Sequence, residues 1–188
     1  MIPRKPFYFI RHGETEWNKR NVIMGSVDIP LNEAGVAQAK DAGSALSQED
    51  FTVIISSPRK RAFQTAEIIG QKVGKIVIVE NDLVERTWGE AEGQVFEPKH
   101  FDENYTPAGA ETFANFTQRV VSAISSLLLT HELPLIVSHG GVLMALASYF
   151  GYTNLRSHNC ATFFFKPPQY EKDLWIISHV NGEDNGNT

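Results

Sequence analysis

The stretch that decides the fold is residues 7–18, FYFIRHGETEWN. Its apolar start, FYFI, predicts a short buried strand, and Arg11 and His12 follow at the point where that strand ends. An arginine and a histidine beside each other at a strand end, taken alone, are more often part of a solvated loop. The meaning of the pair therefore depends on what the rest of the chain places beside it.

Short runs of β-branched and aromatic residues alternate with helical stretches along the chain. Strands are predicted at residues 7–11, 52–56, 75–80, 133–139, 161–166 and 174–180, and helices at 31–48, 61–73, 111–130 and 141–150. This alternation implies crossover connections and a mainly parallel sheet with helices on both faces. The segment PPQYEKD between the last two strands suits a hairpin, so we expect an antiparallel edge strand.

Length and composition predict one globular domain over residues 1–188, since 42% of the residues are hydrophobic and 21% are charged. The formal net charge of -5, without a block of Lys or Arg, argues against general binding to nucleic acid or an acidic membrane surface. No apolar run approaches the roughly 20 residues of a membrane span, and no signal-peptide core is visible, so a cytoplasmic location is expected. No pattern in the sequence indicates an oligomeric state.

Residues 81–109 form the longest stretch without clear periodicity. Long irregular segments in compact domains are often lids or binding loops, so we expect a short cap over about residues 86–110. A solvated connection fits the same pattern equally well.

Chemically active side chains follow each of four predicted strands. They are Arg11 and His12 after the first strand, Arg59 and Arg61 after the second, Glu85 after the third, and His139 after the fourth. Gly140, which directly follows His139, lets the backbone approach a bound group closely. Ligands of open parallel sheets bind beyond the carboxyl ends of the strands, so these side chains are expected to meet at one edge. Each residue alone has an ordinary structural explanation, and it is the joint occurrence that indicates a site.

Such a set suits phosphoryl transfer. Guanidiniums bind phosphate oxygens in pairs, and a neutral histidine nitrogen is a nucleophile. A carboxyl group can protonate a leaving oxygen, and arginines can supply the positive charge that many enzymes take from a metal ion. The single cysteine, Cys160, excludes a cysteine-based metal cage, and no histidine pair has metal-ligand spacing. No metal and no cofactor are expected.

The sequence resembles the histidine phosphatase superfamily, also called the phosphoglycerate mutase-like proteins. The motifs that carry the resemblance are FIRHGETEWN (9–18), PLNEAGVAQAKDAG (30–43), SSPRKRAFQTAEII (56–69), LVERTWGEAEG (83–93), PAGAETFANFTQRV (107–120), VSHGGVLMAL (137–146) and NCATFFFK (159–166). They run in order over nearly the whole chain. The resemblance implies a three-layer α/β/α sandwich and a two-step reaction through phosphohistidine on a small phosphorylated substrate.

The resemblance also implies roles for single residues. His12 is similar to the nucleophile, Arg11, Arg61 and His139 to the phosphoryl pocket, and Glu85 to the proton donor. Residues Asn18, Gly25, Arg59 and Gly140 match, or lie close to, positions that contact the substrate. Glu111 and Arg119 fall where the family has a structural helix start. Met24 departs from the family pattern, because relatives often carry a polar residue there.

The family contains both mutases and phosphatases. Here Trp88 and Phe96 stand where the glycolytic mutases carry a tyrosine and a lysine, and the segment after Glu85 is rich in acidic residues. A second anionic group would be repelled there, which favours a phosphomonoester hydrolase. Phosphoglycerate mutase-type transfer and a catalytically silent, phospho-ligand-binding regulator remain the alternatives.

Overall fold

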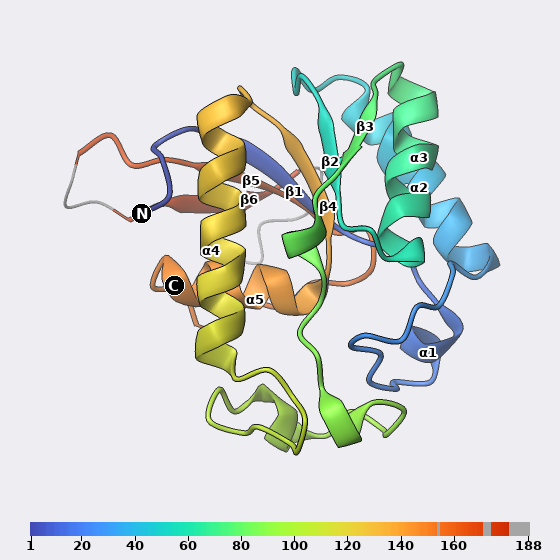
Figure 1. Ribbon diagram of the computed structural model, residues 1–188. Helices are drawn as coiled ribbons and strands as arrows, with labels where there is room; N and C mark the ends of the chain where they lie inside the picture. Colours follow the sequence, from blue (N-terminus) through green and yellow to red (C-terminus); the bar gives the residue numbers. More distant parts are fainter. Residues whose placement is uncertain (154, 171–173, 181–188) are drawn as a thin grey trace.

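A six-stranded sheet runs through the middle of the molecule, and helices cover both of its faces (Figure 1). The computed structural model describes residues 1–153, 155–170 and 174–180. The strands are β1 (Phe7–Arg11), β2 (Ile54–Ser56), β3 (Val77–Val79), β4 (Leu135–Ser138), β5 (Thr162–Lys166) and β6 (Ile176–His179). Their order across the sheet is β3-β2-β4-β1-β5-β6. The α/β sandwich predicted from the sequence is confirmed.

Strands β3, β2, β4 and β1 are parallel to one another. Strand β5 is antiparallel to β1, and the edge strand β6 is antiparallel to β5. The predicted antiparallel edge is therefore present. It involves two strands instead of one, because β5, which lies between β1 and the edge strand β6, is antiparallel to both. The predicted hairpin connection PPQYEKD lies partly outside the described residues.

The helices are α1 (Glu16–Lys19), α2 (Glu33–Leu46), α3 (Lys60–Val73), α4 (Phe113–Thr130) and α5 (Gly140–Tyr149), with 3-10 turns η1 (Asn81–Leu83), η2 (Gly89–Ala91) and η3 (Pro98–Phe101). Helices α2 and α4 begin two residues later than predicted. The reason is side-chain capping, since Asn32 accepts a hydrogen bond from the Gly35 N–H and Thr112 accepts one from the Asn115 N–H. Among the described residues, no helix is long and apolar enough to cross a membrane.

The core lies in two parts, one on each face of the sheet, because side chains alternate along a strand. In β1, Phe7 and Phe9 pack toward α4 and α5, whereas Tyr8 and Ile10 pack toward α2 and α3. Figure 1 shows these two helix pairs on opposite sides of the sheet. All four side chains are buried, so the strand is fixed from both faces and holds its final residue in place.

The segment between η1 and α4, which corresponds to the expected cap, lies below the sheet in Figure 1. It is joined to the loop after α1 by a bridge between Val22 and Val95, and folds back on itself through a bridge between Trp88 and Ala110. A backbone hydrogen bond adds to this contact, because the Phe96 N–H donates to the Asn21 carbonyl at 2.7 Å. Two segments distant in sequence thus meet beside the carboxyl ends of the strands.

Candidate active site

A cavity of about 410 Å³ opens between the carboxyl ends of the parallel strands and the segment 86–110. Of the residues singled out from the sequence, its lining includes Arg11, His12, Asn18, Gly25, Arg61, Glu85 and Gly140. Seven predicted site residues are therefore brought together at one edge of the sheet. His139 and Arg59 are absent from the lining that the described residues form.

His12 lies just past the end of β1 and is only 2% exposed. Its Nδ1 is 2.7 Å from the carbonyl oxygen of Gly13, and because a carbonyl can only accept, Nδ1 carries the proton. The lone pair is left on Nε2. Burial, followed by the charges of Arg61 and Arg11, lowers the pKa of His12 well below its ordinary value of 6.5, so the ring is neutral at neutral pH.

Two guanidiniums lie beside His12. Arg11 donates from Nη1 to the carbonyl of Ser157 at 2.5 Å, and its Nε is buried without a hydrogen-bond partner among the described residues. Arg61 is fully buried, and burial lowers its pKa to about 10, so it stays charged at neutral pH. Its Nη1 and Nη2 donate to the carbonyls of Val27 and Gly25 at 2.9 and 3.1 Å, while its Nε is likewise buried and unpartnered within the described structure. Buried donors of this kind favour an anionic ligand.

His139 lies behind the cavity, and its ring centroid is 5.3 Å from that of His12. It is completely buried, and its Nε2 is 2.8 Å from the hydroxyl of Ser57. Its Nδ1 has no partner in the part of the chain that the structure describes. Burial and the charge of Arg61 lower the pKa of His139 well below its ordinary value. Arg59, the N-cap residue of α3, is half-buried close to this group.

Glu85 approaches the same cavity from the segment after η1. Its Oε1 accepts the Arg86 N–H at 2.8 Å, and its Oε2 accepts the Gly141 N–H at 3.0 Å, in the first turn of α5. A side chain at position 141 would place Cβ 2.2 Å from Oε1, so only glycine lets the carboxylate approach this backbone. Gly141, the second glycine after His139, therefore helps to position Glu85.

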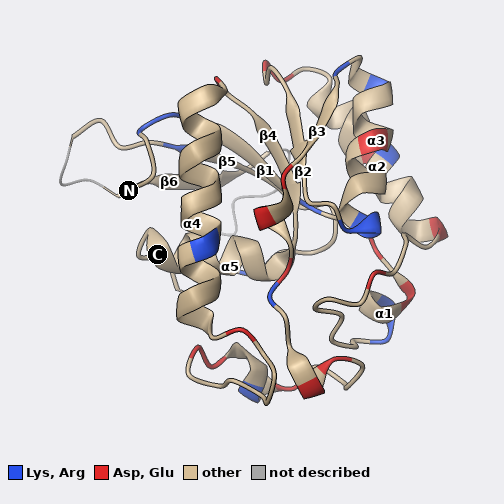
Figure 2. Ribbon diagram, viewed as in Figure 1, with Lys and Arg blue, Asp and Glu red and all other residues tan. Residues whose placement is uncertain are grey.

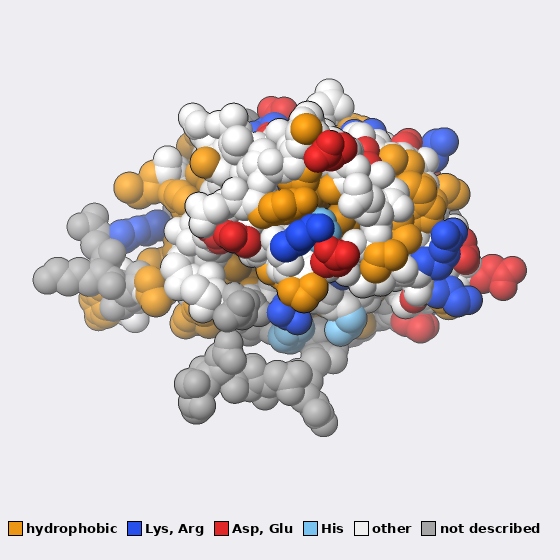
Figure 3. All heavy atoms as spheres, turned by 90° about the horizontal axis from the view of Figure 1, so that it is seen from below, with side chains coloured by type: hydrophobic (Ala, Val, Ile, Leu, Met, Phe, Trp, Pro, Cys, Tyr) orange, Lys and Arg blue, Asp and Glu red, His pale blue; other side chains and the backbone are white. Residues whose placement is uncertain are grey.

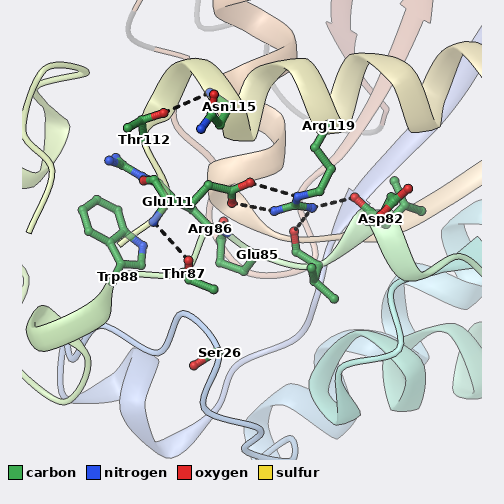
Figure 4. A network of polar contacts seen from close by, with 12 residues as sticks. Ser26, Asp82, Glu85, Arg86, Thr87, Trp88, Glu111, Thr112, Asn115 and Arg119 are labelled. Atoms are coloured by element: carbon green, nitrogen blue, oxygen red, sulfur yellow. Dashed lines mark hydrogen bonds and ion pairs between the residues drawn. The ribbon is translucent and has the colours of Figure 1, made fainter. Parts of the chain in front are cut away.

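The segment that carries Glu85 is held by the ion pair between Arg119 and Glu111, 2.8 Å apart (Figure 4). Arg119 also donates to the carbonyls of Asp82 and Val84, at 2.7 and 3.1 Å, on the N-terminal side of Glu85. On the other side, Arg86 donates to the Glu111 carbonyl at 2.8 Å. The structural interpretation of the pair from the sequence agrees with these contacts.

Asn18 lies at the rim, in the one-turn helix α1. Its Oδ1 accepts hydrogen bonds from the backbone N–H of Thr15 at 3.1 Å and from Asn159 at 3.2 Å. Asn159 also donates to the His12 carbonyl at 3.0 Å, which ties the strand end to the loop before β5. Met24, where relatives often carry a polar residue, lines the cavity and receives the Thr15 hydroxyl at 3.2 Å on its sulfur.

Beyond the end of the cavity that holds His12, aromatic side chains form much of the wall. Trp88, Phe96, His100 and Phe101 line the cavity and contact one another edge to face or at a tilt. Figure 3, which looks at the molecule from below, shows basic, acidic and histidine side chains among apolar ones near the middle of this face. The wall therefore offers an apolar surface with charged groups interspersed in it.

Charges of both signs line this outer part of the cavity. The acidic residues are Asp102 and Glu103, and the basic ones are Arg86 and Arg156. The guanidinium of Arg86 lies 4.5 Å from the Trp88 ring, and that of Arg156 lies 4.4 Å from the Phe101 ring. Figure 2 shows how frequent acidic positions are along the segment between η1 and α4.

Sequence reasoning missed Ser57, Asn159, Arg86 and Arg156. Arg86 directly follows Glu85, and Ser57 lies two residues before Arg59, but neither pattern nor spacing distinguished them. Asn159 and Arg156 lie on a loop whose path depends on tertiary structure. No group of three or more His, Cys, Asp or Glu in the described ranges could hold a metal ion.

Comparison with known proteins bears on this site. Residues 7–165 match the family model of the histidine phosphatase superfamily (branch 1). The chain is 32% identical over 178 residues to the uncharacterized phosphatase PhoE of Bacillus subtilis, covering 92% of each chain. It is 37% identical over 154 residues to phosphoglycerate mutase-like protein 4 of Arabidopsis thaliana, covering 73% of this chain and 67% of that one.

Solved structures show the same fold. A mycobacterial glucosyl-3-phosphoglycerate phosphatase superposes with a TM-score of 0.81 at 22% identity, covering 92% of this chain and 97% of that chain. A phosphoserine phosphatase of Entamoeba histolytica superposes with a TM-score of 0.78 at 22% identity, covering 95% and 98%.

Proposed function

Because this chain belongs to the histidine phosphatase superfamily, we propose that it is a phosphomonoester hydrolase that acts through a phosphohistidine at His12 on a small phosphorylated substrate. The observation that carries this proposal is the state of His12. Its Nδ1–H donates a hydrogen bond to the Gly13 carbonyl, its Nε2 lone pair is free, and two guanidiniums stand beside it.

In the first step, Nε2 of His12 attacks phosphorus and the bond from phosphorus to the substrate oxygen breaks. Arg11 and Arg61 neutralise the negative charge on the transferred group, and their unpartnered Nε–H groups are donors for its oxygens. Ser57 accepts the Arg59 N–H at 3.3 Å, which leaves its own hydrogen for Nε2 of His139. We therefore assign the His139 proton to Nδ1, as a further donor to the phosphoryl group.

Glu85 completes the reaction. In its protonated form it gives its proton to the leaving oxygen, and the resulting carboxylate then takes a proton from water as that water attacks the phosphohistidine. Inorganic phosphate is released and His12 returns to its neutral state. Each oxygen of Glu85 accepts one backbone hydrogen bond, which orients the group without using all of its lone pairs.

The residues that line the outer cavity favour hydrolysis over phosphoryl transfer of the mutase type. Asp102 and Glu103 repel a second anionic group, and the aromatic wall suits an apolar part of the leaving alcohol. Arg86 and Arg156 favour the second candidate, a mutase, because they could hold a carboxylate. Arg86 already donates to the carbonyls of Glu111 and Tyr105, at 2.8 and 3.0 Å, which makes it a weaker anchor.

The two candidates are separated by following both products in one assay. Purified protein is given each monophosphoglycerate and a panel of phosphorylated metabolites, and released phosphate and isomerised substrate are measured together. We expect phosphate release to exceed isomerisation. Isomerisation faster than phosphate release would establish the mutase, and absence of any turnover would favour a regulator that binds phosphorylated ligands without reaction.

A further inference from the structure

Glu92 connects the cap segment to the catalytic end of the cavity. Its Oε1 accepts the backbone N–H groups of Ser26 and Trp88 at 2.8 and 3.0 Å, and its Oε2 accepts the Ser26 hydroxyl at 2.6 Å. One carboxylate thus joins the loop after α1 to the segment after Glu85. Figure 4 shows Ser26 and Trp88 on these two neighbouring segments.

The residues on either side of Ser26 hold Arg61. The Gly25 carbonyl accepts from Nη2 and the Val27 carbonyl accepts from Nη1, so both terminal nitrogens of the guanidinium are oriented by this one turn. Arg61 is fully buried, and its unpartnered Nε–H lies in the plane of the same guanidinium. A movement of the Ser26 turn would therefore rotate the guanidinium.

The turn is shaped to receive Glu92. Gly25 has a φ of 50°, a left-handed conformation that suits glycine, and a Cβ there would lie 2.2 Å from Oε1 of Glu92. Burial opposes the charge on Glu92, but the hydrogen bonds from Ser26 and Trp88 outweigh it and lower the pKa of the carboxyl, so Glu92 is ionised at neutral pH. The carboxylate is not part of the cavity lining formed by the described residues.

We propose that Glu92 is a positioning residue that orients Arg61 toward the transferred phosphoryl group by clamping the Ser26 turn to Trp88. This inference rests on the proposed function. Glu92 touches no reacting atom, and it acts through the carbonyls of Gly25 and Val27. Its removal should weaken oxyanion binding and the chemical step, since both depend on the plane of the Arg61 guanidinium.

Glutamine separates geometry from charge at this position. Its single carbonyl oxygen can accept both backbone N–H groups, as Oε1 does now, and its amide can donate to the Ser26 hydroxyl once that hydroxyl turns. Glu92→Gln should therefore keep the turn, whereas Glu92→Ala removes all three hydrogen bonds. Glu90→Ala is the matched control, because Glu90 is an exposed acid on the same segment, outside this set of contacts.

The experiment measures inorganic phosphate binding by calorimetry and turnover of para-nitrophenyl phosphate. For Glu92→Ala we expect phosphate affinity to fall roughly tenfold, the scale of losing a hydrogen bond to a charged group, with Glu92→Gln and Glu90→Ala close to wild type. A double-mutant cycle adds Arg61→Lys. If Glu92 acts through Arg61, Glu92→Ala should cost little further affinity in that background.

Three results would overturn the inference while wild type remains active. The first is a phosphate affinity of Glu92→Ala equal to that of Glu90→Ala, and the second is a loss of affinity in Glu92→Gln as large as in Glu92→Ala. The third is full additivity of the losses caused by Glu92→Ala and Arg61→Lys. If Glu92→Ala fails to fold, Ser26→Ala takes its place in the same cycle, with a smaller expected loss because the backbone bond to Ser26 remains. Wild-type protein that neither binds phosphate nor hydrolyses the ester would instead remove the proposed function.

Discussion

The imidazole rings of His12 and His139 lie 5.3 Å apart, centroid to centroid, in a fully buried pair that comes from the ends of two neighbouring parallel strands. Each ring has its own fixed partner, the Gly13 carbonyl for His12 and the Ser57 hydroxyl for His139. The pair is therefore held neutral and oriented, with the His12 ring in the lining of the cavity and the His139 ring behind it.

This arrangement predicts how stability depends on pH. The folded-state pKa of each histidine lies below the unfolded value of about 6.5, so unfolded chains bind protons that folded chains do not. The stability from the neutral pair is complete above that value and is lost as pH falls below it, by up to about 1.4 kcal/mol per pH unit for each histidine. Urea unfolding at several pH values measures the slope.

His12→Asn tests the assignment of that slope, because it removes one of the two groups and keeps a short polar side chain. The variant should lose less stability than wild type between neutral and mildly acidic pH. Identical slopes for the two proteins would mean that His12 titrates normally in the folded state.

Glu85→Gln tests the proposed role of Glu85 as proton donor. The variant keeps an oxygen for one of the two backbone N–H groups but cannot supply the proton, so kcat for an alkyl phosphate should fall by about 10²–10⁴. Para-nitrophenyl phosphate needs little protonation of its leaving oxygen and should lose much less. Equal losses for the two esters would argue against proton donation by Glu85, and Glu90→Gln serves as the control.

Arg119→Met tests the support of Glu85. The ion pair with Glu111 has side chains that are 21% and 19% exposed, and its loss also frees the carbonyls of Asp82 and Val84. Unfolding free energy should fall by roughly 2 kcal/mol, and kcat should fall because Glu85 is no longer fixed.

Lys5→Met is the control for this change, because its ion pair with Glu132 is far more exposed, at 32% and 73%. That substitution should cost less than about 1 kcal/mol and leave kcat unchanged. An Arg119→Met protein with wild-type kcat would limit Arg119 to stability alone.

Excess chelator should leave turnover unchanged, because in the proposed mechanism Arg11 and Arg61 supply the positive charge at the transferred group. The measurement is kcat before and after dialysis against chelator, with a metal-dependent phosphatase treated in parallel to show that chelation is complete. Loss of activity that a divalent cation restores would contradict this account.

Much of this architecture could be predicted from the sequence, for physical reasons that differ between elements. Strands such as β1 and β4 are buried on both faces and read as continuous apolar runs, so their ends, and with them Arg11, His12 and His139, could be placed. Glu85 could be predicted only through its place after the third strand and the family motif. The residues that orient these groups are less visible, because Ser57 and Glu92 act through contacts between segments far apart in the chain.

The outer cavity shows the same limit. Of the acidic residues noted after Glu85, Asp102 and Glu103 line the cavity, whereas Glu92 supports the Ser26 turn. Arg156 reaches the wall from the loop before β5, which no periodicity could place. The number of acidic residues in the segment after Glu85 therefore predicted the charges that line the outer cavity only in part.

The most direct test of the central claim is chemical trapping of the intermediate. Wild-type protein is mixed with a labelled phosphomonoester, quenched in base within milliseconds, digested and analysed by mass spectrometry. The account predicts one acid-labile, base-stable phosphoryl group on the peptide that contains His12, and none in His12→Asn. A phosphoryl group on His139, or turnover by His12→Asn at the wild-type rate, would contradict it.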